Sequence, residues 1–218
     1  MKRNITVTLD KAREWFNSGN ATLKEVALQA FNEDELVYSF NDITTFYKAC
    51  EALNLSYSSM LGIASSIATI SKASAAMFQL NIIRKALNLG QDLHLTKNTK
   101  NSDIYYPRNP FATESSVHYE GGIDTGKMQV IGKIKNDGIL YNVLGGNTHT
   151  CGGEGLGLFH SCCGVGFADA DLGFLGCATK EIAQHFSKYF GMLITEAKYG
   201  DMADFEVIGN IHDTERKV

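Results

Sequence analysis

The chain has 218 residues, 44% of them hydrophobic, so it is long enough to bury a substantial core, and intrinsic disorder is excluded. The formal net charge is −4 and the basic residues form no cluster. Nucleic-acid-binding proteins carry such a basic cluster, so this class of protein is excluded. The most apolar stretch, residues 60–70, is too short for a membrane span, which requires about 20 residues. We therefore predict a buried helix there and no membrane partner.

The N-terminus and the cysteines indicate where the chain folds. Residues 1–10 alternate polar and apolar side chains and lack the continuous apolar run of a secretory signal. The five cysteines are an odd number at irregular spacing, which does not suit a disulfide framework. These features predict a reducing compartment or assembly inside a cell.

Short elements are predicted near the N-terminus. The alternation over residues 5–9 predicts a half-buried strand. Asp10 is suited to cap a helix that ends at Gly19. Thr22, followed three residues later by a glutamate, predicts a capping box and a second helix that ends near Phe31.

Residues 1–40 are thus expected to form a compact strand–helix–helix unit. Its acidic exit at residues 32–35 is either a linker or a solvated turn. Asp42 is suited to cap a third helix that ends near Leu53, and another helical pattern follows over residues 59–70.

The last of these helical patterns, residues 73–89, carries an apolar stripe. Its members recur every three or four residues, as on one face of a helix: Met77, Leu80, Ile83 and Leu87. Gly90 stands just past the expected end. We predict that the stripe is core without a further function, and that residues 41–100 form one helical region.

The character of the chain changes near residue 91. Turn formers and both prolines predict a loop-rich bridge. Two strand-like runs, residues 128–135 and 139–144, flank Asn136-Asp137-Gly138, a strong hairpin signal because Asp and Gly tolerate positive φ. Residues 145–176 hold ten of the 21 glycines and show neither helical nor strand periodicity.

The chain closes with a helix and a short strand. Thr179 is suited to cap a helix whose apolar side carries Ile182, Ala183, Phe186, Tyr189 and Phe190. Alternation over residues 205–208 predicts an edge strand. The order predicts an α+β fold, with a helical N-terminal half and a β- and loop-rich domain at residues 101–218 that is closed by a helix.

Catalytic and cofactor motifs are weak. The glycine run at residues 152–157 lacks the third glycine of a dinucleotide fingerprint and the lysine of a P-loop. Several side chains are of metal-ligating types, namely His149, Cys151, His160, Cys162, Cys163 and Cys177. They lack the Cys-x(2–4)-Cys spacing of structural zinc sites. The alternative interpretation is that they are small surface or half-buried residues of a loop region and bind no ion.

A thiol enzyme is the remaining catalytic arrangement. Cys163 with His149 or His160, and with Asp169 or Asp171, supplies the residue types of a nucleophile, a base and an orienting carboxylate. Such a triple arises easily by chance among five cysteines and six histidines. We predict a non-enzymatic protein without metal or cofactor, and keep a zinc or thiol site in segment 149–177 of an intracellular protein as the alternative.

Residues 147–171 have an unusual composition. They contain no Lys, Arg, Gln, Met or Trp and a single Glu. Every other residue type present can be written with a codon ending in a pyrimidine, as expected when asparagine-type codons are randomised at their first two positions. We predict a ligand-binding surface that stacks on and hydrogen-bonds to a glycan or protein through His149, Phe159, His160, Phe167, Asp169 and Asp171.

With these residues in view, the chain resembles a group of phage and prophage proteins from gut Bacteroidetes. The resemblance rests on residues 5–20, 82–88, 104–107, 173–183 and 189–191, and it covers most of the chain. Several members of the group look like targets of diversity-generating retroelements, whose variable segments sit on C-type-lectin-like frames and bind diverse ligands.

The resemblance implies a virion structural protein, either a fibre or a capsid-decorating protein, that is assembled in the host cytoplasm. Residues 1–40, with Trp15 and Phe16, would attach to the particle, and residues 147–171 would point outward. The implied partners are other virion proteins, further copies of the chain in a homo-oligomer, and a host surface glycan or protein. The calcium motifs of animal lectins are absent.

Overall fold

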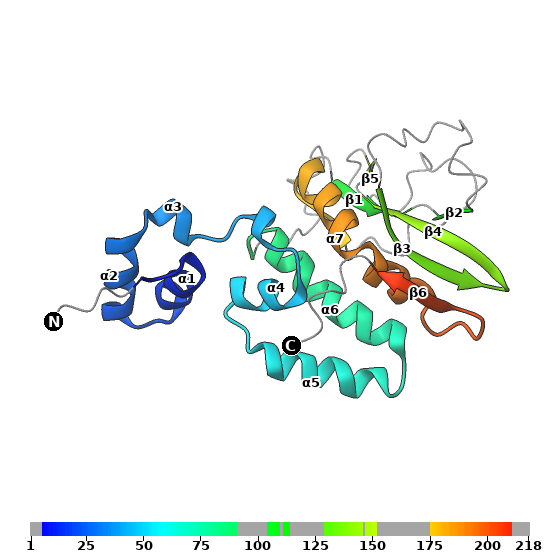
Figure 1. Cartoon of the computed structure of the whole chain (residues 1–218), viewed down its shortest axis with the longest axis horizontal. Helices are drawn as coiled ribbons and strands as arrows, with labels where there is room; N and C mark the ends of the chain where they lie inside the picture. The colour runs from blue at the N-terminus through cyan, green and yellow to red at the C-terminus, as the bar shows by residue number, and fades with distance from the viewer. Residues whose placement is uncertain are drawn as a thin grey trace, which may run out of the picture.

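A computed structural model gives the arrangement of the chain (Figure 1). It describes residues 6–90, 104–109, 111–113, 129–145, 147–151 and 175–210. The fold is α+β, with helices in the N-terminal half and strands in the C-terminal half, which confirms the predicted class. Within these ranges no helix is long and apolar enough to cross a membrane.

Three helices form an N-terminal unit: α1 (Leu9–Asn17), α2 (Ala21–Ala30) and α3 (Glu33–Leu36). The strand expected over residues 5–9 is wrong for the residues described there, because Thr8 caps α1 by accepting a hydrogen bond from the backbone of Lys11. Thr8 thus takes the place predicted for Asp10. Asn20 likewise takes the capping place predicted for Thr22.

The acidic run after Phe31 is neither a linker nor a simple turn. Asn32 and Glu35 form a reciprocal capping box that starts α3. Leu36, at the end of α3, is fully buried together with Ala12 and Ala27, so the three helices enclose a small core of their own.

The next helices are α4 (Phe46–Ala52), α5 (Tyr57–Ala68) and α6 (Lys72–Leu87). The hydroxyls of Thr45, Ser56 and Ser71 cap them in turn. The third predicted helix therefore starts later than expected. Asp42 instead ends a 3-10 turn, η1 (Phe40–Asp42), and its carboxylate accepts a hydrogen bond from the backbone of Ser39.

The helix predicted over residues 60–70 forms as α5, but the expected burial is wrong. Ala64 is its only buried residue, and Ile70 just beyond its end is 90% exposed. Among the described elements, α5 contacts chiefly α4 and α6, so its opposite side has no neighbour. By contrast, the stripe on α6 is core as predicted: Leu80, Ile83 and Leu87 are fully buried and Met77 packs against them.

Six strands form two antiparallel sheets in the described part of the chain. A two-stranded sheet pairs β1 (Ile104–Arg108) with β5 (Asn147–Cys151). A second sheet has the order β2–β4–β3–β6, from β2 (Phe111–Ala112), β3 (Gln129–Asn136), β4 (Ile139–Gly145) and β6 (Glu206–Asn210). The predicted hairpin is confirmed as β3–β4, whose turn residues Asp137 and Gly138 have φ of 48° and 75°. The predicted edge strand is confirmed as β6.

Strands also occur where none were expected. The bridge after residue 91 contains β1, in which Pro107 lies opposite Thr148. Proline has no N–H to donate, so it fits in a strand where its nitrogen faces away from the partner strand. Tyr105, two residues earlier, forms its backbone hydrogen bonds on the side away from β5. Alternate residues of a strand direct their backbone groups to the same side, so the nitrogen of Pro107 also faces away from β5. Residues 147–151, predicted to be irregular, form β5.

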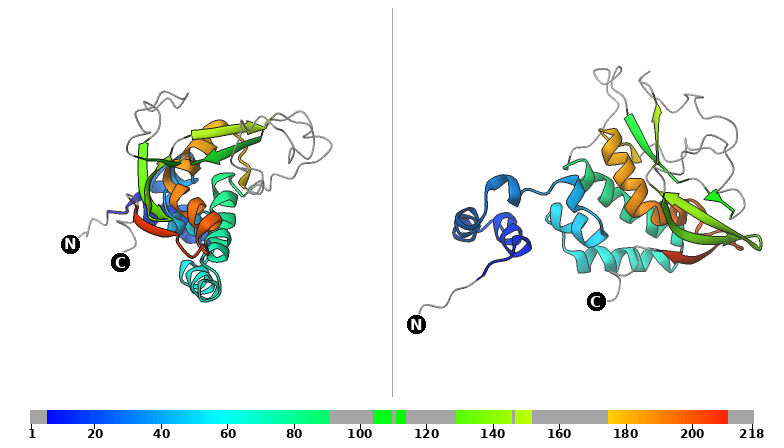
Figure 2. Two further views of the ribbon diagram at one scale, coloured as in Figure 1. Left: turned by 90° about the vertical axis from the view of Figure 1, so that its right-hand side faces the viewer. Right: turned by 45° about the horizontal axis from the view of Figure 1, so that its top comes forward.

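Helix α7 (Lys180–Tyr199) organises the main body. The hydroxyl of Thr179 caps it, and four of its five predicted apolar residues are buried while Tyr189 is partly buried, so this prediction is confirmed. The helix contacts α6 and also β1, β3, β4 and β5, so it lies between the helical layer and the strands (Figures 1 and 2). Residues of α4, α6 and α7 consequently share one hydrophobic core.

Candidate functional site

Strand β1 pairs with the chain at the start of the segment predicted to bind a ligand, residues 147–171, and again six residues after its end. On one side of β1, Ile104 pairs with Cys151 at the end of β5. On its other side, the N–H of Tyr105 donates to the oxygen of Cys177 (3.1 Å) and the N–H of Cys177 donates to the oxygen of Tyr105 (2.8 Å). The chain therefore leaves β1 at residue 151 and returns to it at residue 177.

The returning end is fixed by Asn88, the C-cap residue of α6, which is 3% exposed. Its amide nitrogen donates to the oxygens of Arg84 (2.9 Å) and Gly176 (3.2 Å), and its amide oxygen accepts from the N–H of Ala178 (2.9 Å). Leu175, just before this clamp, is fully buried in the main core. The backbone at 175–178 is therefore held by side-chain hydrogen bonds, strand pairing and burial together.

The leaving end is fixed where β4 meets α7. The side-chain nitrogen of Asn109 donates to the oxygens of Leu144 and Ser187, at 2.9 Å each, and so links β4 to α7. A Cβ added to Gly145 would lie 2.6 Å from a methyl group of Ile131 and 3.0 Å from the Ser187 oxygen. This contact requires glycine, and it brings the chain against α7 just before β5 begins.

Of the predicted ligand-binding residues, the structure places only His149. It lies in β5, opposite Tyr106 of β1. The other five lie outside the described residues: Phe159, His160, Phe167, Asp169 and Asp171. The structure thus positions residues 147–151 at the start of the segment, the backbone from residue 175 onward just after it, and one member of the predicted set.

The described cysteine thiols are unsuited to metal binding or nucleophilic attack. Cys177 is fully buried, and burial raises the pKa of its thiol to about 12. Burial likewise raises the pKa of the Cys50 thiol to about 11. Because the thiolate is the reactive form, both groups are inert at neutral pH. Among the residues that the structure describes, no group of three His, Cys, Asp or Glu side chains could hold a metal ion.

The residues predicted for particle attachment lie in the small core of the N-terminal unit. Trp15 and Phe16 are partly buried and pack against the buried Ala12, Ala27 and Leu36. The ammonium group of Lys24 lies 4.6 Å from the centre of the Phe16 ring. Trp15 and Phe16 therefore hold the three helices together.

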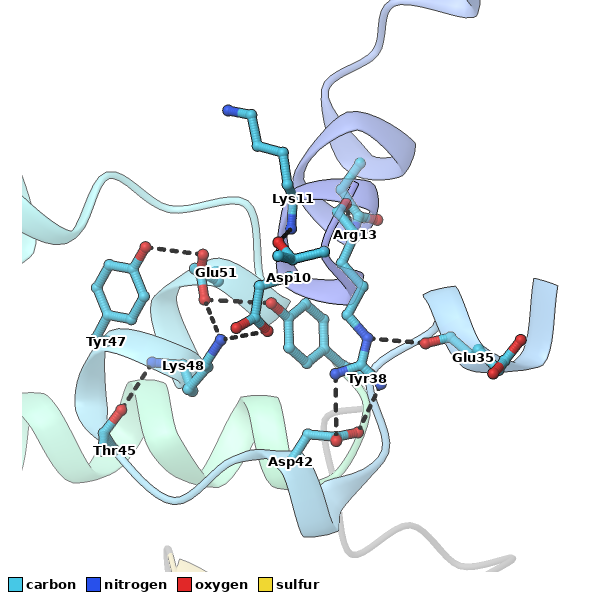
Figure 3. Close-up of polar contacts among 12 residues, drawn as sticks. Asp10, Lys11, Arg13, Glu35, Tyr38, Asp42, Thr45, Tyr47, Lys48 and Glu51 are labelled. Atoms are coloured by element: carbon cyan, nitrogen blue, oxygen red, sulfur yellow. Dashed lines mark hydrogen bonds and ion pairs between the residues drawn. The ribbon is translucent and has the colours of Figure 1, made fainter. Parts of the chain in front are cut away.

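A polar junction joins this unit to the main body (Figure 3). The guanidinium of Arg13, a residue 8% exposed, donates to the backbone oxygen of Glu35 (2.8 Å) and pairs with Asp42 (3.2 Å). It also lies 4.8 Å from the centre of the Tyr38 ring. Partial burial raises the pKa of Asp42, but hydrogen bonds from Ser39 and Arg13 outweigh it and hold that pKa below its ordinary value.

A second set of contacts completes the junction. Lys48 of α4 pairs with Asp10 of α1 (3.0 Å) and with Glu51 (3.1 Å). The Tyr38 hydroxyl donates to Glu51 (3.2 Å). Burial, reinforced by Glu51, raises the pKa of Tyr38 to about 12, so the hydroxyl stays protonated. The N-terminal unit is thus bound to α4 and η1 through charged groups and one phenol.

The chain matches no family model, no curated protein and no solved structure. The expected C-type-lectin-like frame therefore stays a prediction.

Sequence reasoning missed Asn88, Asn109 and the polar junction. Asn88 sits at a helix end, where asparagine is common, and its partners lie about ninety residues away. Arg13 offered a faint signal, because it follows Ala12 on the side of α1 that faces the core. Its partner Asp42 is 29 residues further on and could not be assigned from spacing.

Proposed function

We propose that the chain is a non-enzymatic structural protein of a bacteriophage virion, a fibre or a capsid-decorating protein, that presents residues 147–171 to a ligand on the host surface. The observation that supports this is the pairing of β1 with residues 147–151, where the segment starts, and with Cys177, six residues after it ends. Binding loops function on rigid scaffolds, because the scaffold maintains its shape while the loop sequence varies. Here β1 and α7 supply that scaffold.

The N-terminal unit supports an attachment role. It has its own core, separate from the core shared by α4, α6 and α7. Its links to the main body are the polar contacts of Arg13, Tyr38 and Lys48. A unit built in this way can dock on other virion proteins without disturbing the frame that presents the ligand-binding segment.

The alternative is an intracellular protein with a zinc or thiol site in segment 149–177. Its returning end, Cys177, is a poor candidate because the thiol is buried and its pKa is raised to about 12. Elemental analysis of the purified protein distinguishes the two proposals. A stoichiometric zinc ion in the purified protein would favour the alternative. Folded protein that contains no zinc would favour the display role.

Paired substitutions test the display role. We expect the double variant Phe159→Ala, His160→Ala to enter particles normally and to reduce adsorption to host cells. Met202→Ala, at a residue 51% exposed outside the segment, serves as the control and should leave both properties unchanged. Normal adsorption of the double variant, or its failure to assemble, would count against a ligand-binding surface.

A deletion tests the attachment role. Removing residues 1–37 takes away the N-terminal unit and stops before Phe40, which packs against the main core. We expect the truncated chain to unfold at the same temperature as the main body of the full chain and to be lost from particles. Normal incorporation of the truncated chain would refute attachment through this unit.

A further inference from the structure

A short segment, residues 37–39, links the N-terminal unit to the main body, and the unit lies to one side of that body (Figures 1 and 2). The segment belongs to no helix or strand. The backbones of Val37 and Ser39 are extended, and Val37 is 52% exposed. Hinges are usually a few such residues between elements, because these absorb changes of φ and ψ without repacking a core. Residues 37–39 therefore have the properties of a hinge.

The hydrophobic cores of the unit and the main body are separate. Among the described residues, the core of the unit includes none beyond Leu36, and the main core includes none before Phe40. Helices α1, α2 and α3 contact chiefly one another. Tyr38 in the hinge is buried, but the side chains near its ring are the charged groups of Arg13 and Lys48. The unit can consequently separate from the main body without opening either core.

Two ion pairs of opposite polarity cross the junction (Figure 3). Asp10 of α1 pairs with Lys48 of α4 (3.0 Å). Arg13, one turn further along α1, pairs with Asp42 of η1 (3.2 Å). Turning the unit so that the two pairs exchange partners would bring the carboxylates together and the cations together. Because like charges repel, the two pairs favour a single docked orientation.

The hinge is held by the same charges. In Figure 3, Tyr38 lies between Lys48 and Arg13, whose charged groups are 6.0 Å and 4.8 Å from the centre of its ring. Cations at this distance are attracted to the face of an aromatic ring. Arg13 belongs to the N-terminal unit, so Tyr38 loses part of its cover whenever the unit moves away.

Salt weakens these contacts, whereas their charges persist at neutral pH. Partial burial raises the pKa of Asp42, but hydrogen bonds from Ser39 and Arg13 hold it below its ordinary value. Partial burial lowers the pKa of Lys48, but its hydrogen bonds to two carboxylates raise it above its ordinary value. The side chains of Lys48 and Asp10 are 23% and 69% exposed, so salt ions reach them. The screening length falls from about 10 Å at 0.1 M salt to about 3 Å at 1 M.

We propose that the N-terminal unit is a hinged arm that turns on residues 37–39 and is latched to the main body by the two ion pairs. The latch is closed at low ionic strength and opens when salt screens the pairs, while the helices of both bodies stay folded. It thus determines whether the main body stands at a fixed or a variable angle to whatever the unit binds. This inference does not depend on the proposed virion role.

Limited proteolysis measures the opening. Chymotrypsin cleaves after tyrosine in accessible, extended chain, and Tyr38 becomes accessible when Arg13 moves away. We expect fragment 1–38, followed by mass spectrometry, to appear about fivefold faster or more at about 1 M than at about 0.05 M sodium chloride. A short peptide substrate cleaved under the same conditions corrects for the effect of salt on the protease. Small-angle X-ray scattering should show a larger radius of gyration at the higher salt concentration.

Reversing one charge tests whether the ion pairs form the latch. Asp10→Lys places two ammonium groups together, so we expect about fivefold faster release of the fragment at about 0.05 M sodium chloride. The excess over the original chain should disappear towards about 1 M, because salt also screens repulsion. Glu25→Lys is the matched control. It makes the same change of charge at an exposed residue of α2, on the side of the unit away from the main body, and should be cleaved like the original chain (Figure 1).

Two further measurements distinguish an arm that turns from one that unfolds. Trp15, the single tryptophan of the chain, packs in the core of the unit, so its fluorescence reports on that core. We expect its emission maximum and the helical circular dichroism to be the same at both salt concentrations and in Asp10→Lys. Red-shifted emission would show that the unit unfolds, and would overturn the proposal. Cleavage that is independent of salt, or equal in Asp10→Lys and Glu25→Lys, would overturn it as well.

Discussion

The Nε2 atom of His185 lies 2.8 Å from the backbone oxygen of Ile43, and this contact ties α7 to the segment that leads from the N-terminal unit. Because a carbonyl only accepts, Nε2 carries a hydrogen and donates it. The imidazole ring lies edge-on to Phe40 and 4.5 Å from the ring of Tyr189. Burial lowers the pKa of His185 below its ordinary value, more than the hydrogen bond to Ile43 raises it.

This histidine makes stability depend on pH. Its pKa is lower in the folded chain, so as the pH falls the unfolded chain binds the proton first. The stability contributed by the neutral ring is complete above about pH 6.5 and decreases as the pH falls below it. His185→Gln keeps an N–H donor without a titrating ring. We expect the unfolding temperature of the original chain to fall more than that of the variant between about pH 7.5 and about pH 5. Equal falls would contradict this role.

Arg13 should control how firmly the N-terminal unit is held. Arg13→Ala removes the contacts with Asp42, Tyr38 and the Glu35 oxygen, and hydrogen bonds of charged groups are worth about 1.5–3 kcal/mol. We expect faster hydrogen exchange in α1 and α2, and unchanged exchange in α6 and α7.

Lys11→Ala is the control for this substitution. Lys11 lies on the same helix and pairs with Glu14, but both side chains are about half exposed, so the pair is worth about 0–1 kcal/mol. Equal exchange in the two variants would show that the Arg13 contacts do not hold the unit. Faster exchange in α6 and α7 would show that the unit and the main body unfold together.

Much of the fold follows from local signals in the sequence. Thr179 lies three residues before Ile182, the first residue of an apolar helical stripe, and the Asp137-Gly138 turn lies between two strand-like runs, so α7 and the β3–β4 hairpin were both predictable. The capping residues were less so. Thr8 and Asp10 are both good caps two residues apart, and the choice of Thr8 coincides with an ion pair between Asp10 and Lys48 of α4.

Other features depend on neighbours that spacing does not reveal. An apolar helix such as α5 looks the same in sequence whether or not an element covers its outer side. Strand β5, with Thr148 and Thr150 on either side of His149, lacks apolar alternation, and it forms against β1, whose paired residues lie 39 to 47 positions earlier. For the candidate site, the sequence predicted the segment but gave no sign that β1 pairs with the chain both at residues 147–151 and at Cys177.

Gly145 should be intolerant of any side chain. Its added Cβ would press on Ile131 and the Ser187 oxygen, which belong to packed elements that cannot move independently. We expect Gly145→Ala to lower the free energy of unfolding by about 1–3 kcal/mol, measured in urea. Gly209→Ala, where a Cβ has open space, should change it by about 0.5 kcal/mol or less. A tolerated Gly145→Ala would mean that β4 is not held against α7 at this point.

Asn88 should matter more than any other single side chain for holding the returning end of the ligand-binding segment. Asn88→Ala leaves the Ala178 N–H and the Gly176 oxygen without their partner in a buried site, at a cost of about 1–3 kcal/mol. Asn81→Ala is the control on the same helix, because Asn81 is exposed and bonds only within α6. It should cost about 0.5 kcal/mol or less.

Asn88→Asp separates the hydrogen bonds from the volume of the side chain. The carboxylate can still accept from the Ala178 N–H, but it cannot donate and would face the Arg84 and Gly176 oxygens at close range. We therefore expect Asn88→Asp to be at least as destabilising as Asn88→Ala, and both variants to show faster exchange of the Cys177 and Ala178 amides. Slow exchange of these amides in both variants would mean that pairing with Tyr105 and burial of Leu175 hold the returning end without Asn88.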